Sequence, residues 1–238
     1  MNFILLFIFA GTFVLTISGN AQTSTIDSVG GLKIITETKL TEQSLHDARL
    51  QMVDLKKYIP SLNFDLKYAS NENFMHEKLY PRITTTYLRR SAAAALKSAA
   101  ADLKEIGKGL LIFDAYRPYE VTKLMWQKIG DPRYVADPSK GSGHNRGIAV
   151  DLTLTLYGDN KPLPMPTGFD NFSDTAHSNF EQLPDSIKNN REILKKIMEQ
   201  NGFIQLSTEW WHFYLPGSEK YDVMDISFKR LKKISYKH

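Results

Sequence analysis

The chain has 238 residues, of which 42% are hydrophobic and 24% charged, and its formal net charge at pH 7 is +4. This length and composition favour one globular domain with a single sizeable core and exclude a largely disordered chain. The absence of cysteine excludes disulfides, thiol catalysis, a lipidated cysteine anchor and cysteine zinc ligands. Any metal site must therefore use His, Asp or Glu.

The chain begins with an apolar run, residues 3–17, which is followed by the small residues Gly19 and Ala21. This pattern predicts a signal peptide over residues 1–21, with Gln22 first after cleavage, so we expect export to the periplasm or cell envelope. Fifteen apolar residues are short for a membrane span of about 20. A retained anchor is the alternative, because no lysine or arginine precedes the run.

Residues 22–50 are rich in Thr, Ser and charged residues with weak periodicity, which predicts a tether and then a short helix from Thr41. Residues 51–228 are expected to form the functional domain. Within it, residues 63–69 (NFDLKYA) alternate apolar and polar side chains, as in a strand. Residues 89–106 carry five alanines among the first eleven, which indicates a packed helix that ends at Gly107.

A short apolar run, residues 109–113 (GLLIF), predicts a buried strand that ends at Asp114. The sequence continues as DAYRP, in which Pro118 suits the first turn of a following helix up to Gly130. Arg117 is then left at the junction of strand and helix. Loops at strand ends often carry functional residues.

Residues 142–155 (SGHNRGIAVDLTLT) alternate from Ala149 onward, which predicts a half-buried strand with Asp151 on its polar face. An acid beside a core is costly unless a partner neutralises it. His144 lies seven residues upstream, across a bend that contains Gly147. A bound cation would satisfy both side chains.

Residues 158–184 hold four prolines and two glycines, which indicates a long irregular loop with a functional role. An amphipathic helix is expected over residues 184–201, followed by a strand over residues 203–215 that bears Glu209 and His212 in the sequence EWWH. The last ten residues, 229–238, are basic and predict a solvated tail. No nucleic-acid-binding motif is present, so no nucleic-acid partner is expected.

His144, Asp151 and His212 make a set of three ligands of the kind that catalytic zinc sites use, with a water as the fourth ligand. Glu209 is then an unliganded carboxylate that can take a proton from that water. In an ideal strand, residues three apart point to opposite faces, so Glu209 and His212 converge only if the strand bends there. A surface acid at Glu209 is the alternative.

Together, SGHNRGIAVD and EWWH resemble the zinc D-alanyl-D-alanine peptidases, and FDAYRP at residues 113–118 narrows the resemblance to the D-Ala-D-Ala dipeptidases known from vancomycin resistance. The similarity runs from about residue 63 to about residue 214. It implies one Zn²⁺ per chain, Glu209 as the catalytic base, and Arg117 as the group that stabilises the oxyanion. A salt bridge from Arg117 to Asp114 is the structural alternative.

The same resemblance implies that Asp170 holds the free amino group of a dipeptide and that Ser142 and Tyr68 contact the substrate. The alternatives are that Asp170 is a loop acid without a role in binding, that Ser142 only shapes the turn, and that Tyr68 is a core residue. The fold class that we expect is α+β, with helices packed on a small, mainly antiparallel sheet that resembles hedgehog domains and D,D-peptidases.

The predicted activity is zinc-dependent hydrolysis of D-Ala-D-Ala to two D-alanines, with this small dipeptide as the partner and no stable membrane span after signal cleavage. A D,D- or L,D-carboxypeptidase that trims peptidoglycan stems, or a metal-bearing wall-binding module without turnover, remain the alternatives. The oligomeric state does not follow from the sequence.

Overall fold

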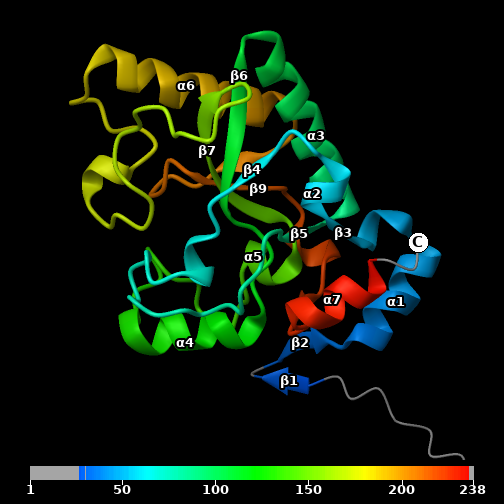
Figure 1. Cartoon of the computed structure of the whole chain (residues 1–238). Helices are drawn as coiled ribbons and strands as arrows, with labels where there is room; N and C mark the ends of the chain where they lie inside the picture. Colours follow the sequence, from blue (N-terminus) through cyan, green and yellow to red (C-terminus); the bar gives the residue numbers. More distant parts are fainter. Residues whose placement is uncertain (1–26, 30, 236–238) are drawn as a thin grey trace, which may run out of the picture.

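A five-stranded sheet runs through the centre of the computed structural model, which describes residues 27–29 and 31–235 (Figure 1). Its strand order is β4-β6-β7-β9-β8. The strands are β4 (Asn63–Phe64), β6 (Lys108–Asp114), β7 (Ala149–Leu156), β9 (His212–Tyr214) and β8 (Ile204–Gln205). Only β4 and β6 pair in parallel, and the other neighbours are antiparallel. The predicted α+β class with a mainly antiparallel sheet is confirmed.

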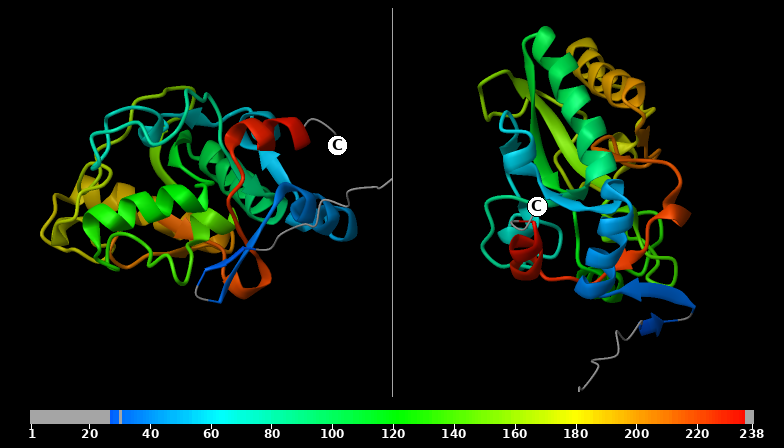
Figure 2. Two further views of the ribbon diagram at one scale, coloured as in Figure 1. Left: turned by 90° about the horizontal axis from the view of Figure 1, so that it is seen from below. Right: turned by 90° about the vertical axis from the view of Figure 1, so that its right-hand side faces the viewer.

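Two long helices, α3 (Arg90–Glu105) and α6 (Asp185–Gln200), pack side by side against one face of this sheet (Figures 1 and 2). Along α3 the buried side chains recur at helical spacing and are mostly alanines: Ala92, Ala93, Leu96, Ala99 and Leu103. Small side chains let the helix lie close to the sheet. Both helices begin and end within one residue of the predicted ranges.

The central strand β7 is buried on both faces, whereas its alternating sequence predicted burial on one face only. Every residue from Ala149 to Thr155 is buried. The loop of residues 158–184 folds back onto the sheet: the Leu163 N–H donates to the Leu154 carbonyl at 2.8 Å, and the Phe169 ring packs against Phe113 of β6, with 5.0 Å between the ring centroids. Asp151 is therefore buried, although the alternation placed it on a polar face.

The expected strand over residues 203–215 is two short strands, β8 and β9, which pair with each other antiparallel. Residues 206–211 form the turn between them, so Glu209 lies in the turn and His212 at the start of β9. The Trp210 N–H donates to the Ala176 carbonyl at 2.9 Å, and the Trp211 carbonyl accepts the Leu152 N–H of β7 at 3.1 Å, so the turn is tied both to the long loop and to the sheet. The prediction of one continuous strand was wrong.

Both described ends of the chain are folded onto the domain and meet in a second sheet, β1-β2-β10. Its strands are β1 (Asp27–Val29), β2 (Leu32–Ile35) and β10 (Val223–Met224). Helix α1 (Glu37–His46) begins four residues before the predicted start at Thr41, and it contacts α7 (Phe228–Ile234), as Figure 2 also shows. The expected tether and solvated tail are therefore corrected: α1 buries Leu40, and α7 buries Leu231, which lies within the expected tail.

The other elements are short and position the loops. They are η1 (Ala48–Leu50), β3 (Met52–Asp54), α2 (Leu55–Tyr58), η2 (Lys67–Ala69), β5 (Tyr87–Arg89), α4 (Tyr119–Ile129), α5 (Gly143–Arg146), η3 (Asp174–Ala176) and η4 (Ser218–Lys220). The strand predicted over residues 63–69 ends at Phe64, and its second half is the turn η2. This turn places Tyr68 in the interior.

The apolar run of residues 3–17 and the expected cleavage site after Ala21 lie outside the described residues. Across residues 31–235 and the short strand before them, no helix is long and apolar enough to cross a membrane.

Candidate active site

His144 is held by the one-turn helix α5, whose start follows from its sequence. The Ser142 hydroxyl accepts the Asn145 N–H at 3.1 Å, and the Asn145 side-chain oxygen accepts the Ser142 N–H at 3.0 Å, which is a capping box. Gly147 ends the turn at φ 72°, a left-handed conformation that glycine adopts without strain. The His144 Nδ1–H donates to the Ala115 carbonyl at 2.6 Å. Nε2 is thereby left as the nitrogen that can bind a metal.

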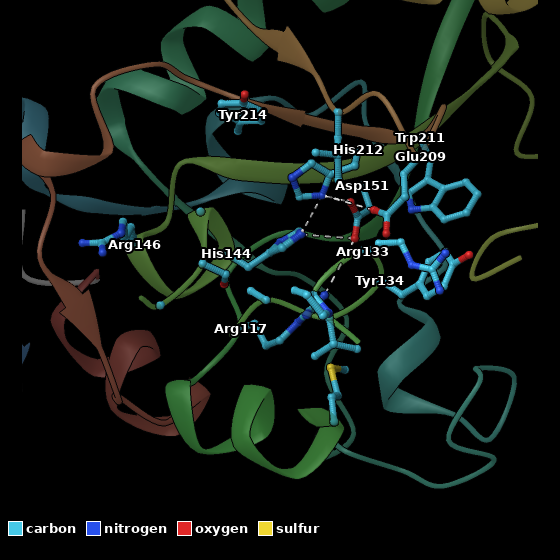
Figure 3. Close-up of a pocket in the computed structure, with 18 of the residues that line it drawn as sticks. Arg117, Arg133, Tyr134, His144, Arg146, Asp151, Glu209, Trp211, His212 and Tyr214 are labelled. Carbon is cyan, nitrogen blue, oxygen red and sulfur yellow. Dashed lines mark hydrogen bonds and ion pairs between the residues drawn. The ribbon is translucent and has the colours of Figure 1, made fainter. Parts of the chain in front are cut away.

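Strand pairing brings Asp151 and His212 together, because they are direct partners across β7 and β9. His212 Nδ1 lies 2.9 Å from Asp151 Oδ1 and 3.2 Å from His144 Nε2. His144 Nε2 is 3.3 Å from Asp151 Oδ2. Two segments about 60 residues apart in the chain thus converge on one point (Figure 3).

These three side chains fit a zinc ion in both chemistry and spacing. Ligands at 2.0–2.1 Å around a tetrahedral zinc lie about 3.3 Å from one another, close to the separations measured here. They are also the one His/Asp/Glu cluster of this kind among the described residues. Burial raises the pKa of the Asp151 carboxyl, but His144 and His212 outweigh burial and hold it below its ordinary value. The carboxylate is therefore charged, as a metal ligand must be.

Glu209 lies beside this cluster without belonging to it. Its Oε2 is 3.8 Å from His212 Nδ1, because the turn between β8 and β9 lets both side chains face the same side. The bend on which the sequence argument depended is thus present as a turn. Burial, and then the nearby charges of Asp151 and Asp170, raise the pKa of Glu209 well above its ordinary value. Such a carboxyl is suited to accept and return a proton.

Arg117 makes the salt bridge to Asp114 that was the structural alternative, and it also faces the metal ligands. Its Nε and Nη2 donate to Asp114 Oδ2 at 3.0 and 2.8 Å, and Nη2 lies 3.9 Å from Asp151 Oδ2. The guanidinium also lies over the Tyr68 ring, 5.0 Å from its centroid. The structural and functional readings of Arg117 are therefore compatible.

Two residues that the sequence analysis did not single out fix this arginine in place. The Tyr80 hydroxyl donates to the second oxygen of Asp114 at 2.8 Å, so the buried carboxylate is fully engaged. The Asn145 side chain donates to the Arg117 carbonyl at 2.9 Å and so joins α5 to the DAYRP loop. Their roles depend on long-range contacts, and no local sequence pattern signals them.

Asp170 enters the same pocket from the long loop, in a left-handed conformation (φ 58°) that is strained for a residue other than glycine. The Tyr68 hydroxyl donates to its Oδ1 at 2.9 Å, and the Phe74 N–H donates to Oδ2 at 3.4 Å. Burial raises the pKa of Asp170 to about 7. Its charge is therefore costly in this buried position, and a cation bound beside it would stabilise it.

All eight candidate residues line one hollow of about 400 Å³. Ser142 lies at its wall, where its hydroxyl accepts the cap hydrogen bond and still has a proton to donate. Further lining residues had not been predicted: Phe74, Arg133, Tyr134 and Trp211. Of these only Trp211, between Glu209 and His212, had a signal in the sequence. Figure 3 shows Arg133 and Tyr134 near Glu209, across the pocket from Arg146.

An α+β domain that gathers two histidines, an aspartate, a separate buried glutamate and an arginine in one pocket has the design of a metallohydrolase. A family model described as D-Ala-D-Ala dipeptidase, of the M15 peptidases, matches residues 48–231. The D-alanyl-D-alanine dipeptidase of Escherichia coli (strain K12) is 36% identical over 178 residues, which is 75% of this chain and 91% of that protein. The chain belongs to the D-alanyl-D-alanine dipeptidase family, and the family predicted from its motifs is confirmed.

A second relative, the D-alanyl-D-alanine dipeptidase of Enterococcus faecium, is 30% identical over 186 residues, or 68% of this chain and 89% of that protein. Among solved structures, the zinc complex of the vancomycin resistance D,D-pentapeptidase VanY is 16% identical with a TM-score of 0.37. It covers 64% of this chain and 80% of the other. A similarity at that level supports no statement about function.

Proposed function

We propose that this protein hydrolyses D-Ala-D-Ala to two D-alanines. The observation that carries the proposal is one pocket that holds the His144, Asp151 and His212 cluster, the unliganded Glu209 and, from a different loop, Asp170, in a chain of the dipeptidase family. The direct test is an assay of the purified protein on D-Ala-D-Ala beside a pentapeptide stem. Release of two D-alanines from the dipeptide is expected, and cleavage of the pentapeptide alone would contradict it.

His144, Asp151 and His212 would hold one zinc ion. When bound, zinc lowers the pKa of a water to about 7 and polarises the scissile carbonyl. The chain's own residues then move the protons. Glu209 accepts a proton from the attacking water and delivers it to the leaving nitrogen. Both protons of the water end on that nitrogen as the C–N bond breaks, and the water oxygen stays in the new carboxylate.

Arg117 is positioned to stabilise the negative charge that develops on the carbonyl oxygen. Two of its five N–H groups are engaged by Asp114, which leaves three to donate elsewhere. Because Asp114, Tyr80 and the Tyr68 ring hold the guanidinium in place, no reorganisation is needed as the charge forms.

Asp170 is the counter-charge for a substrate ammonium. A free dipeptide brings one positive charge, which would ionise Asp170 and pair with it in a pocket shielded from water. The Tyr68 hydroxyl orients that carboxylate. A longer stem or an acylated dipeptide carries no ammonium at this point and would leave Asp170 without its partner. The loop acid therefore favours the dipeptidase over the carboxypeptidase alternative, and Glu209 disfavours a binding module without turnover.

The zinc ligands can be tested by metal analysis. The wild type is expected to bind about one zinc per chain. His144→Ala and His212→Ala should each weaken zinc binding by more than about 10- to 100-fold, which is the cost of losing a residue that only hydrogen-bonds to a metal ligand. His177→Ala is the matched control, because His177 lies outside both the cluster and the pocket. Full zinc retention in both cluster variants would rule out this site.

We propose further that the protein is exported and that residues 1–21 are removed. The apolar run and the small residues before Gln22 support this proposal. The mass of the protein recovered from the cell envelope is expected to match a chain that starts at Gln22. A mass that includes Met1 would indicate a retained anchor.

A further inference from the structure

Residues 27–47 precede the part of the chain that the family model matches, yet they are integrated into the fold. Strand β2 pairs in parallel with β10, where Ile34 lies opposite Val223 and Ile35 opposite Met224. Asp222, the residue before β10, accepts two hydrogen bonds on its Oδ2, from Lys33 Nζ at 3.0 Å and from Gln43 Nε2 at 2.6 Å. The N-terminal segment therefore holds the stretch around β10 through both backbone and side chains.

The side chains of β2 and β10 contact both loops that carry site residues. Gly141, at φ 65°, has no room for a side chain, because a Cβ there would lie 2.6 Å from Val223 Cγ2 and 3.4 Å from Leu32 Cδ2. The next residue is the N-cap of the helix that bears His144. On the other side, Ile34 packs in one cluster with Val223 and Tyr119. Tyr119 opens α4, two residues after Arg117.

The stretch before β10 also supports the far end of the His144 helix. Arg146 Nη1 donates to the Tyr221 carbonyl at 2.6 Å. The buried Arg89 donates from Nη2 to the Asp222 carbonyl at 3.3 Å and from Nε to the Arg146 carbonyl at 3.0 Å. The helix that presents His144 thus contacts residues 221–224 at both of its ends, and the N-terminal residues hold these residues in place.

We propose that residues 27–46 are a positioning element of the active site, which acts through residues 221–224 on the loop of His144 and on the start of α4 after Arg117. The physical basis is that the precision of a metal site depends on the groups that orient its ligands, and these groups carry a measurable share of metal affinity. A tether without this role would leave zinc affinity unchanged when it detaches.

The test uses the full chain and replaces an aliphatic residue by Asp at either of two positions in the N-terminal segment, one buried and one exposed. Ile34→Asp puts a carboxylate into the apolar cluster with Tyr119 and Val223, which should detach β2. Leu45→Asp is the control, because Leu45 is 72% exposed on α1. Limited trypsin digestion, with cleavage expected at Lys33 and Lys39, reports detachment. A competing chelator measures zinc affinity at a temperature well below unfolding.

We expect Ile34→Asp to be cleaved within the segment and to bind zinc about tenfold more weakly, with Leu45→Asp like wild type in both respects. A detached segment with wild-type zinc affinity would overturn the proposal. Should Ile34→Asp fail to fold, Asp222→Ala removes only the anchors of Lys33 and Gln43 and carries the same expectation, with Arg230→Ala as its control. Arg230 pairs with Glu37 at 3.0 Å but leads to α7, away from the site. Equal zinc affinity in Asp222→Ala and wild type would also overturn it.

Discussion

Glu209→Gln is expected to lower kcat by about 10²- to 10⁴-fold, the range for a positioned proton-transfer group, while zinc content and KM stay close to wild type. Glutamine has nearly the same size and can still donate and accept hydrogen bonds, but it cannot take a proton from water. Glu209 lies 3.8 Å from the nearest ligand nitrogen and is not needed to complete the cluster. The loss should therefore fall on the chemical step.

The measurement is steady-state kinetics on D-Ala-D-Ala with zinc content determined on the same sample. Glu192→Gln is the control, since Glu192 pairs with Arg191 on α6, away from the pocket. Turnover near wild type in zinc-loaded Glu209→Gln would remove Glu209 as the base.

Arg117→Lys is expected to lower kcat by about 10²- to 10³-fold, the cost of losing one donor to a developing oxyanion. Lysine keeps the positive charge beside Asp114, so the buried carboxylate stays paired, but its three donors sit on one nitrogen and lack the rigid fork with which the guanidinium reaches Asp114 and the carbonyl oxygen at once. Zinc content should not change. Complete removal, as in Arg117→Ala, would be less informative because it leaves Asp114 buried and unpaired.

Arg191→Lys is the matched control for this variant. Arg191 is as deeply buried as Arg117 and also bonds a carboxylate, but it does not line the pocket. An unfolding midpoint near wild type in both variants, with kcat lost only in Arg117→Lys, fits a role at the oxyanion. Equal kcat in Arg117→Lys and wild type would exclude the role at the oxyanion and leave only a structural role in the salt bridge to Asp114.

The sequence predicted best what local spacing determines. The helices α3, α4 and α6 and the strand β6 follow from alanine content, amphipathic periodicity and Gly or Pro at their ends, so their bounds were close. The link between His144 and Asp151 was also accessible, because a short turn and a strand separate them in a single motif.

What depends on distant pairing was not accessible. The polar composition and weak periodicity of residues 22–50 gave no sign that β2 pairs with β10, since a parallel pair about 190 residues apart leaves no local pattern. The basic residues of α7 suggested a solvated tail and concealed the buried Leu231. The alternation in β7 could not reveal that the residues of its polar face are buried as well. The turn that brings Glu209 to His212 became visible only in the fold.

The sequence analysis also treated Asp114 and the substrate as mutually exclusive partners of Arg117, and the structure shows that they are not. A guanidinium has five donors, and the structure shows that Asp114 takes two of them. The salt bridge to Asp114 fixes the side chain in the position from which it can bind the substrate oxygen. The same holds for Tyr68, which is both a buried core residue and the donor that orients Asp170.

The central claim is that this pocket accepts a free dipeptide, and the most direct test compares kcat/KM for D-Ala-D-Ala and its N-acetylated form. An ammonium that pairs with buried Asp170 is worth about 1.5–3 kcal/mol, so wild type should prefer the free dipeptide by roughly 10- to 150-fold. Asp170→Ala should lose activity on the free dipeptide and narrow that preference. Equal cleavage of the two substrates by wild type would contradict the account and favour a carboxypeptidase.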